Sequence, residues 1–103
     1  MGAVLFFAKI FRIIILLRGK TMKLGVVGII IERDRSVAEK VQTILSENAD
    51  LIMGRMGIPD KDRGVYVISV IVRGTNERIS ALTGKLGKLE NVKVKSAVTD
   101  SDD

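Results

Sequence analysis

The order in which β-branched runs and amphipathic segments alternate along this chain allows few folds. Four runs rich in Val and Ile have the length and composition of strands, namely residues 24–31, 51–58, 65–73 and 92–98. The segment from Pro59 to Gly64 has turn-forming residues and joins the second run to the third as a hairpin. We expect Pro59 to end the second strand.

Two amphipathic segments lie between the remaining strands. Ser36 followed by Glu39 has the pattern of a capping box, and apolar residues at helical spacing continue to about Glu47. A second helix, capped by Thr75 or Asn76, has one apolar face made of Ile79, Leu82, Leu86 and Leu89. The order β-α-β-β-α-β predicts an α+β, ferredoxin-like domain, an antiparallel four-stranded sheet with both helices on one face.

The absence of Cys and His excludes many functions. The chain can form no disulfide, thiolate nucleophile, imidazole base or Cys/His metal site. Asp60 and Asp62 lie in a turn, where Asp is favoured for local hydrogen bonding rather than for metal or acid–base chemistry. We therefore expect a binding module with no cofactor and no metal ion, and not an enzyme.

The basic charge is concentrated at one end of the chain. The chain has 17 basic and 12 acidic residues, and four of the basic ones, Lys9, Arg12, Arg18 and Lys20, precede Met22 with no acid among them. The remainder is nearly neutral, and aromatic residues, which could stack on bases, make up only 4% of the chain. A DNA-binding regulator is the alternative function, but we expect direct nucleic-acid binding to be unfavourable.

Residues 1–21 are an apolar and basic extension. Ala3 to Leu17 is shorter than the roughly 20 residues that span a bilayer, and it has neither the basic start nor the cleavage site of a signal peptide. Residues 17–22 can be encoded by a purine-rich ribosome-binding sequence before the Met22 codon, so Met22 is the expected natural start and a membrane-surface anchor is the alternative. We expect a cytoplasmic protein with one domain over 22–99 and a frayed acidic tail, 100–103.

Two stretches resemble the family of iron-only hydrogenase system regulators. These are Gly54-Arg55-Met56-Gly57-Ile58-Pro59 and the run Ala81–Leu89 with its continuation Val92–Ser96, within a similarity that covers residues 23–99. The resemblance implies an ACT-like fold, related to the ligand-sensing domain of nickel-responsive repressors, and a role in hydrogenase expression or maturation. Without His, Cys or a separate DNA-binding segment, direct nickel sensing and operator binding are disfavoured.

The resemblance also implies a place for an effector, because ACT-like domains commonly bind small molecules at the turn after the first strand. Here that turn is Glu32, Arg33, Asp34 and Arg35, which offers both signs of charge beside a helix N-terminus. Such a terminus suits an anion or an amino acid. The alternative interpretation is a solvated, capped loop.

A second candidate contact surface lies on the second helix, where Ser80, Gly84 and Gly87 share a stripe opposite the apolar face. Gly84 inside a helix costs about 1 kcal/mol relative to Ala, so the close approach of a ligand or a partner backbone would explain it. Gly87 can simply end the helix.

The central strands are apolar on both faces, while helices are expected on only one. Each exposed Val or Ile would forgo roughly 1.5–3 kcal/mol of burial, and such patches mark interfaces. We therefore predict a homo-oligomer, a dimer or tetramer, through Val26, Ile30, Tyr66, Ile68, Val70 and Val72. A small-molecule effector and a protein of the hydrogenase system are the other expected partners.

Overall fold

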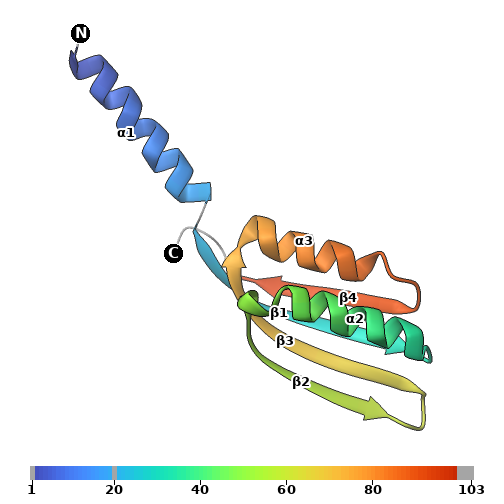
Figure 1. Ribbon diagram of the computed structural model, residues 1–103. Helices are drawn as coiled ribbons and strands as arrows, with labels where there is room; N and C mark the ends of the chain where they lie inside the picture. Colours follow the sequence, from blue (N-terminus) through green and yellow to red (C-terminus); the bar gives the residue numbers. More distant parts are fainter. Residues whose placement is uncertain (1, 20, 100–103) are drawn as a thin grey trace.

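The computed structural model describes residues 2–19 and 21–99, with side chains described outside residues 14–19. From residue 22 onward the elements follow the predicted order, and a further helix precedes them (Figure 1). The elements are α1 (Gly2–Gly19), β1 (Met22–Glu32), α2 (Arg35–Glu47), the 3-10 turn η1 (Ala49–Leu51), β2 (Ile52–Asp60), β3 (Val65–Thr75), α3 (Asn76–Gly87) and β4 (Val92–Val98).

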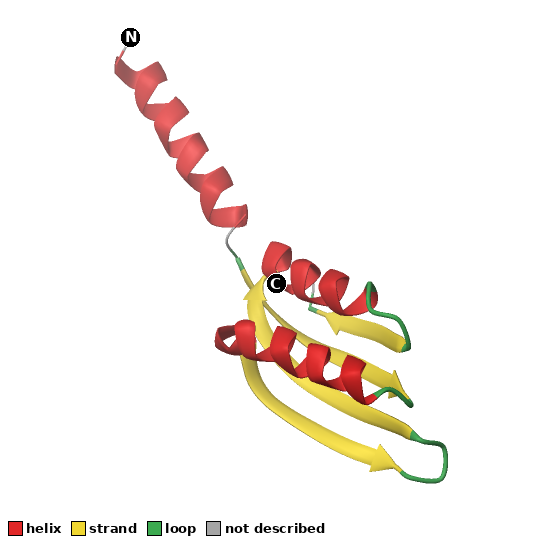
Figure 2. Ribbon diagram, turned by 45° about the vertical axis from the view of Figure 1, so that its right-hand side comes forward, coloured by secondary structure: helices red, strands yellow, loops and turns green. Residues whose placement is uncertain are grey.

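The four strands form one sheet in the order β2-β3-β1-β4, with every neighbouring pair antiparallel. β1 and β3 occupy the centre, and α2 and α3 both lie on the same face of the sheet (Figure 2). This split arrangement of two β-α-β units confirms the predicted ferredoxin-like α+β fold.

The core lies between the sheet and the two helices. Alternate residues of the central strands point into it and are at most 2% exposed: Val27, Ile29, Ile31, Ile68, Val70 and Val72. The helices complete it with buried residues three or four apart: Val37, Val41 and Leu45 from α2, and Ile79, Leu82 and Leu86 from α3. The core is therefore aliphatic throughout.

No helix among residues 2–19 and 21–99 covers the opposite face of the sheet, and we call it the open face. Its exposed apolar side chains include Leu24, Val26, Ile30, Met56, Ile58, Val67 and Ile71. The strand register explains this membership, since Val26 lies opposite Ile71 and Ile30 opposite Val67, and directly opposed residues of neighbouring strands share a face.

The predicted interface set is therefore wrong in part. Val26 and Ile30 do lie on the open face, but Ile68, Val70 and Val72 are fully buried beneath the helices. Tyr66 lies on the same side as these three residues and packs against the core. Since successive side chains of a strand point to opposite faces, the prediction combined one face of β1 with the other face of β3.

The helices α2 and α3 both begin at side-chain caps. The Asp34 carboxylate accepts hydrogen bonds from the amides of Ser36 and Val37, so Asp34, rather than the predicted Ser36, is the N-cap of α2. The Thr75 hydroxyl accepts one from the amide of Arg78, which confirms one of the two predicted caps of α3.

β2 continues past the residue that was expected to end it. Its last residues, Pro59 and Asp60, still pair with β3. Pro is tolerated there because β2 is an edge strand, whose outer side needs no donor. At its other end a register shift between Ile52 and Gly54 marks an irregularity around Met53.

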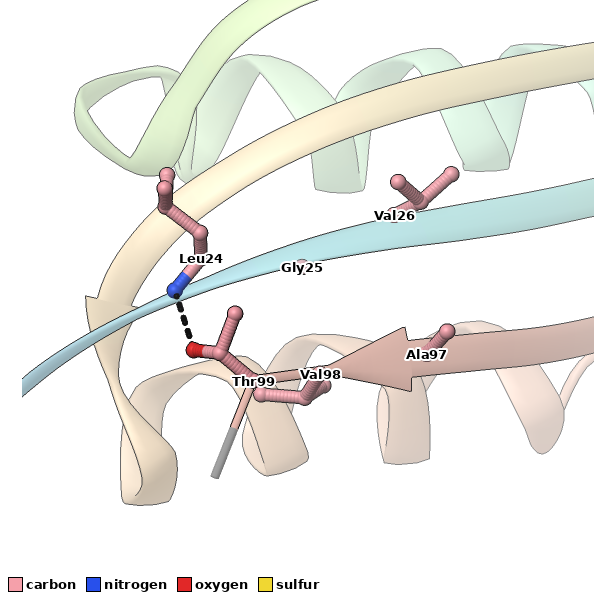
Figure 3. Close-up of a pocket in the computed structure, with 6 residues that line it drawn as sticks. All are labelled: Leu24, Gly25, Val26, Ala97, Val98 and Thr99. Carbon is pink, nitrogen blue, oxygen red and sulfur yellow. Dashed lines mark hydrogen bonds between the residues drawn. The ribbon is translucent and has the colours of Figure 1, made fainter. Parts of the chain in front are cut away.

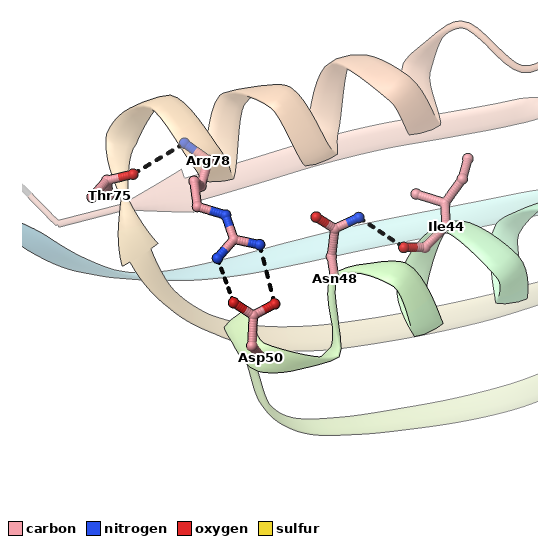
Figure 4. Close-up of polar contacts among 5 residues, drawn as sticks. All are labelled: Ile44, Asn48, Asp50, Thr75 and Arg78. Carbon is pink, nitrogen blue, oxygen red and sulfur yellow. Dashed lines mark hydrogen bonds and ion pairs between the residues drawn. The ribbon is translucent and has the colours of Figure 1, made fainter.

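A polar clamp joins the end of the α2–η1 segment to the start of α3 (Figure 4). The Arg78 guanidinium donates to both carboxylate oxygens of Asp50, and Asn48 Nδ2 donates to the carbonyl of Ile44 at 2.9 Å. The hydrogen bond from Arg78 and its positive charge lower the pKa of Asp50, and the hydrogen bond to Asp50 and its negative charge raise the pKa of Arg78. The clamp lies at the surface and closes one end of the helical layer.

α1 projects away from the sheet (Figure 1), and its described side chains, residues 2–13, are all exposed. Among residues 2–19 and 21–99, no helix combines the length and hydropathy needed to cross a membrane. The predicted acidic tail, 100–103, lies outside the described residues.

Candidate functional site

The turn between β1 and α2 is joined to the β2–β3 hairpin through Arg33. The Arg33 amide donates to the carbonyl of Gly64 at 3.0 Å, and its Nε donates to the carbonyl of Arg63 at 3.1 Å. Arg33 has a φ of 39°, in the left-handed region that is uncommon outside glycine. These contacts with the hairpin hold it there, and Gly64, itself at φ 69°, leaves room for the Arg33 side chain.

Between this turn and the hairpin lies a cavity of about 330 Å³, which we call the turn pocket. Ile31, Ala38 and Tyr66 supply apolar lining, and charged side chains of both segments surround it. The pocket is open to solvent at the end of the sheet where β1 finishes and β3 begins.

Asp34 lies in the pocket, but its carboxylate is already engaged. One oxygen accepts from the Ser36 hydroxyl at 2.7 Å, the Ser36 amide at 3.0 Å and the Val37 amide at 3.2 Å. The Ser36 hydroxyl bond and then the Val37 amide bond lower the pKa of Asp34. The helix N-terminal amides expected to attract an anion are therefore partly occupied by the protein's own cap.

The basic side chains of the pocket are less engaged than the acids. Asp60 accepts from the amides of Asp62 and Arg63, as expected of an Asp in a turn. Within residues 2–19 and 21–99, the side chains of Arg35 and Lys61 have no hydrogen bond or ion pair. The pocket can therefore offer positive charge to a ligand while its carboxylates stabilise the turns.

Two sets of predicted site residues lie outside the turn pocket. Glu32 pairs with Lys93 across the strands, with 3.1 Å between carboxylate and ammonium, and does not line the pocket. Ser80, Gly84 and Gly87 form an exposed stripe on α3, also outside the pocket lining. An added Cβ at Gly84 or Gly87 meets no atom within 4 Å, so no described residue accounts for glycine at either position.

A second cavity, of about 340 Å³, lies between β1 and β4 (Figure 3). The Leu24 amide donates to the Thr99 hydroxyl at 3.1 Å, and the Thr99 amide donates to the Leu24 carbonyl at 2.8 Å. The other lining residues are Gly25, Val26, Ala97 and Val98. None is charged, so the turn pocket is the better equipped of the two for a polar ligand.

The sequence predicts the turn side of the pocket but not its hairpin side. It places Lys61 only in a turn, and it predicts Tyr66 as an interface residue. The signal was present in the element order: a β-α-β-β-α-β sheet pairs the first strand with the third and brings the hairpin beside the first turn.

The β-α-β-β-α-β order and the sheet order β2-β3-β1-β4 define a ferredoxin-like fold, and the chain resembles the ACT-like class within that fold. Within that class the chain belongs to the TM1266-like family, described as iron-only hydrogenase system regulators, a role that the description itself marks as unproven. The family's pattern matches residues 23–96 and confirms the resemblance seen in the sequence. No curated protein matches the chain.

Solved structures agree with this assignment. The uncharacterized protein TM1266 from Thermotoga maritima is 25% identical, with a TM-score of 0.74 over 77% of this chain and 99% of that protein. The ACT domain of GTP pyrophosphokinase from Chlorobium tepidum is 20% identical, with a TM-score of 0.61 over 75% and 88%. The C-terminal domain of MgtC from Mycobacterium tuberculosis is 13% identical, with a TM-score of 0.58 over 77% and 89%. The last two show likeness of fold alone.

Proposed function

We propose that this chain is a cytoplasmic regulatory module of the iron-only hydrogenase system that binds a small anionic effector in the turn pocket and catalyses no reaction. Family membership supports the regulatory role. The observation that carries the effector site is a pocket in which Arg33, Arg35 and Lys61 surround an apolar lining.

The arrangement favours a carboxylate or phosphate ligand with a small apolar part. The side chains of Arg35 and Lys61 have no hydrogen bond or ion pair among the described residues. Arg33 uses its amide and its Nε for hydrogen bonds to the hairpin, which leaves its terminal guanidinium nitrogens for a ligand. Guanidinium groups bind such anions through paired hydrogen bonds. Ile31 and Tyr66 would contact the apolar part.

The same geometry supports binding over catalysis. A general base or nucleophile needs a free carboxylate, but Asp34 caps α2 and Asp60 holds the hairpin turn. Both carboxylates therefore serve the structure of the pocket rather than the chemistry of a ligand.

Self-association through the open face is part of the proposal. Seven apolar side chains of three adjacent strands are exposed together there, and a contiguous patch of this kind marks an interaction surface. A homo-oligomer would bury them, with Lys93 and Lys95 of β4 at the rim.

The effector site is tested by titrating the isotope-labelled full chain with inorganic phosphate and with citrate while recording amide NMR spectra. We expect shifts at Arg33, Arg35 and Lys61, and a loss of affinity of about tenfold in Arg35→Gln. Arg73→Gln, an exposed arginine of the open face, is the matched control. Equal affinity in both variants would refute the site, and tight, steeply salt-dependent DNA binding would favour a DNA-binding regulator instead.

A further inference from the structure

Two apolar surfaces of this chain lack a partner among the described residues. One is the open face of the sheet. The other is α1, where Val4, Phe7 and Phe11 are 74%, 72% and 64% exposed. Aromatic side chains this exposed, next to an uncovered sheet, call for a common explanation.

We propose that α1 of one copy packs across the open face of a second copy, and that the exchange is reciprocal. The inference rests on the proposed self-association and on a chain that includes α1 rather than one that starts at Met22, and it specifies how the self-association occurs. The partner surface is thus a helix on a sheet, rather than one sheet on another.

The charge distribution of α1 fits such a contact. At 100° per residue, Val4, Phe7 and Phe11 share one stripe of the helix, while Lys9 lies opposite that stripe and Arg12 lies about 110° from it, on the flank of the helix. α1 can therefore place an uncharged stripe on a sheet and leave both cations in water.

The dimensions also match. A helix of 18 residues is about 27 Å long and about 10 Å wide. β1 has 11 residues and is about 36 Å long, and the two central strands lie about 4.8 Å apart. One α1 would thus cover most of the length of β1 and β3, where Val26, Ile30, Val67 and Ile71 are exposed.

The connection to β1 favours a second copy over the helix's own sheet. Only residues 20 and 21 separate the end of α1 from the start of β1. Folding back would require them to reverse the chain and to climb about 10 Å from the sheet to the helix layer. Short hinges favour exchange between copies, and α1 already extends away from its own sheet (Figure 2).

Engineered disulfides test this directly because the natural chain has no cysteine. Full-length Ala8→Cys, on α1 beside the stripe, is mixed with full-length Ser69→Cys, at the centre of the open face opposite Gly28. After mild oxidation we expect a mixed disulfide dimer by mass spectrometry. Ser46→Cys, on the exposed surface of α2, is the matched control and should yield little.

Four results would overturn the proposal. The first is an intramolecular disulfide in a monomeric protein that carries both Ala8→Cys and Ser69→Cys, which would place α1 on its own sheet. The second is a Ser69→Cys homodimer without the mixed product, which would retain self-association but pair the sheets directly. The third is α1-dependent binding to anionic lipid vesicles without any mixed product. A full chain that sediments as a monomer at micromolar concentration would refute self-association itself.

A pair of substitutions on α1 gives an independent measurement. We expect Phe7→Ser to raise the dimer dissociation constant about tenfold or more, while Lys9→Ser, on the opposite side of the helix, leaves it unchanged. Circular dichroism should show that both variants keep the fold of residues 22–99, because none of the described side chains of α1, residues 2–13, belongs to the core. Equal dissociation constants would overturn the proposal.

Discussion

The two faces of the sheet are built from the same strands and the same residue types, yet they differ completely in burial. Val27 and Ile29 are fully buried, whereas their neighbours Val26 and Ile30 are 48% and 38% exposed. Hydrophobicity does not distinguish these residues. Their burial depends on the side to which α2 and α3 return, so the crossover connections decide which half of each strand becomes core.

Truncating one isoleucine on each face should reveal the largest difference in stability between the two faces of the sheet. Ile68 is fully buried, so Ile68→Ala should leave a cavity and lower the free energy of unfolding by about 2–5 kcal/mol. Ile71→Ala, three residues along β3 on the open face, should lower it by less than about 1 kcal/mol. Urea denaturation at a protein concentration low enough for the monomer measures both, and equal losses there would mean that the open face is covered within a single copy.

A lysine on each face should then separate folding from association. Val67→Lys places an exposed charge on the open face, so the fold should remain while self-association weakens about tenfold or more. Val70→Lys buries an unpaired charge in the core and should unfold the domain. Sedimentation velocity and circular dichroism distinguish the two, and a Val67→Lys protein with unchanged association would exclude the open face as the interface.

Much of the fold could be predicted from local patterns. The last strand, β4, has the bounds that the sequence predicts, 92–98. The helix α2 ends at Glu47, also as predicted. β2 ran on through Pro59 because an edge strand tolerates proline, and whether a strand lies at an edge depends on sheet order rather than on its own residues. The cap at Asp34 was missed because Ser36 and Glu39 form a competing local pattern.

The local part of the candidate site could likewise be predicted from the sequence, and the part that depends on long-range contacts could not. The turn at Arg33, Asp34 and Arg35 could be located along the chain, but its pairing with Lys61 and Tyr66 could not be located from composition or spacing alone. That pairing depends on a contact between segments about thirty residues apart, such as the hydrogen bond from Arg33 to Arg63. The interface residues of β3 were misassigned for the related reason that two apolar faces look alike in sequence.

Removing a glycine from the helical layer should have a smaller effect, and a stabilising one. An alanine side chain at Gly84 meets no atom within 4 Å, and Ala is favoured over Gly inside a helix by about 0.5–1 kcal/mol. Gly84→Ala should therefore raise the free energy of unfolding by about that amount, measured in urea. Gly87→Ala, at the last residue of α3, should gain less. A destabilised Gly84→Ala protein would show that a contact outside the described residues needs glycine there.

The smallest difference concerns two acids, Glu32 and Asp34, that lie on either side of the β1 terminus. Hydrogen bonds from the Ser36 hydroxyl and the Val37 amide lower the pKa of Asp34, so its ionised form stabilises the folded state. This stabilisation is present at a pH above the ordinary pKa of 3.8 and is lost as the pH falls through the lowered pKa of the folded state.

Asp34→Asn should therefore lower the melting temperature at neutral pH, and the difference from the natural protein should shrink below about pH 4. Glu32→Gln, which removes only an exposed pair with Lys93, is the matched control and should change the melting temperature less. Thermal melts followed by circular dichroism across this range provide the measurement, and a difference for Asp34→Asn that stays constant with pH would show that the charge of Asp34 does not stabilise α2.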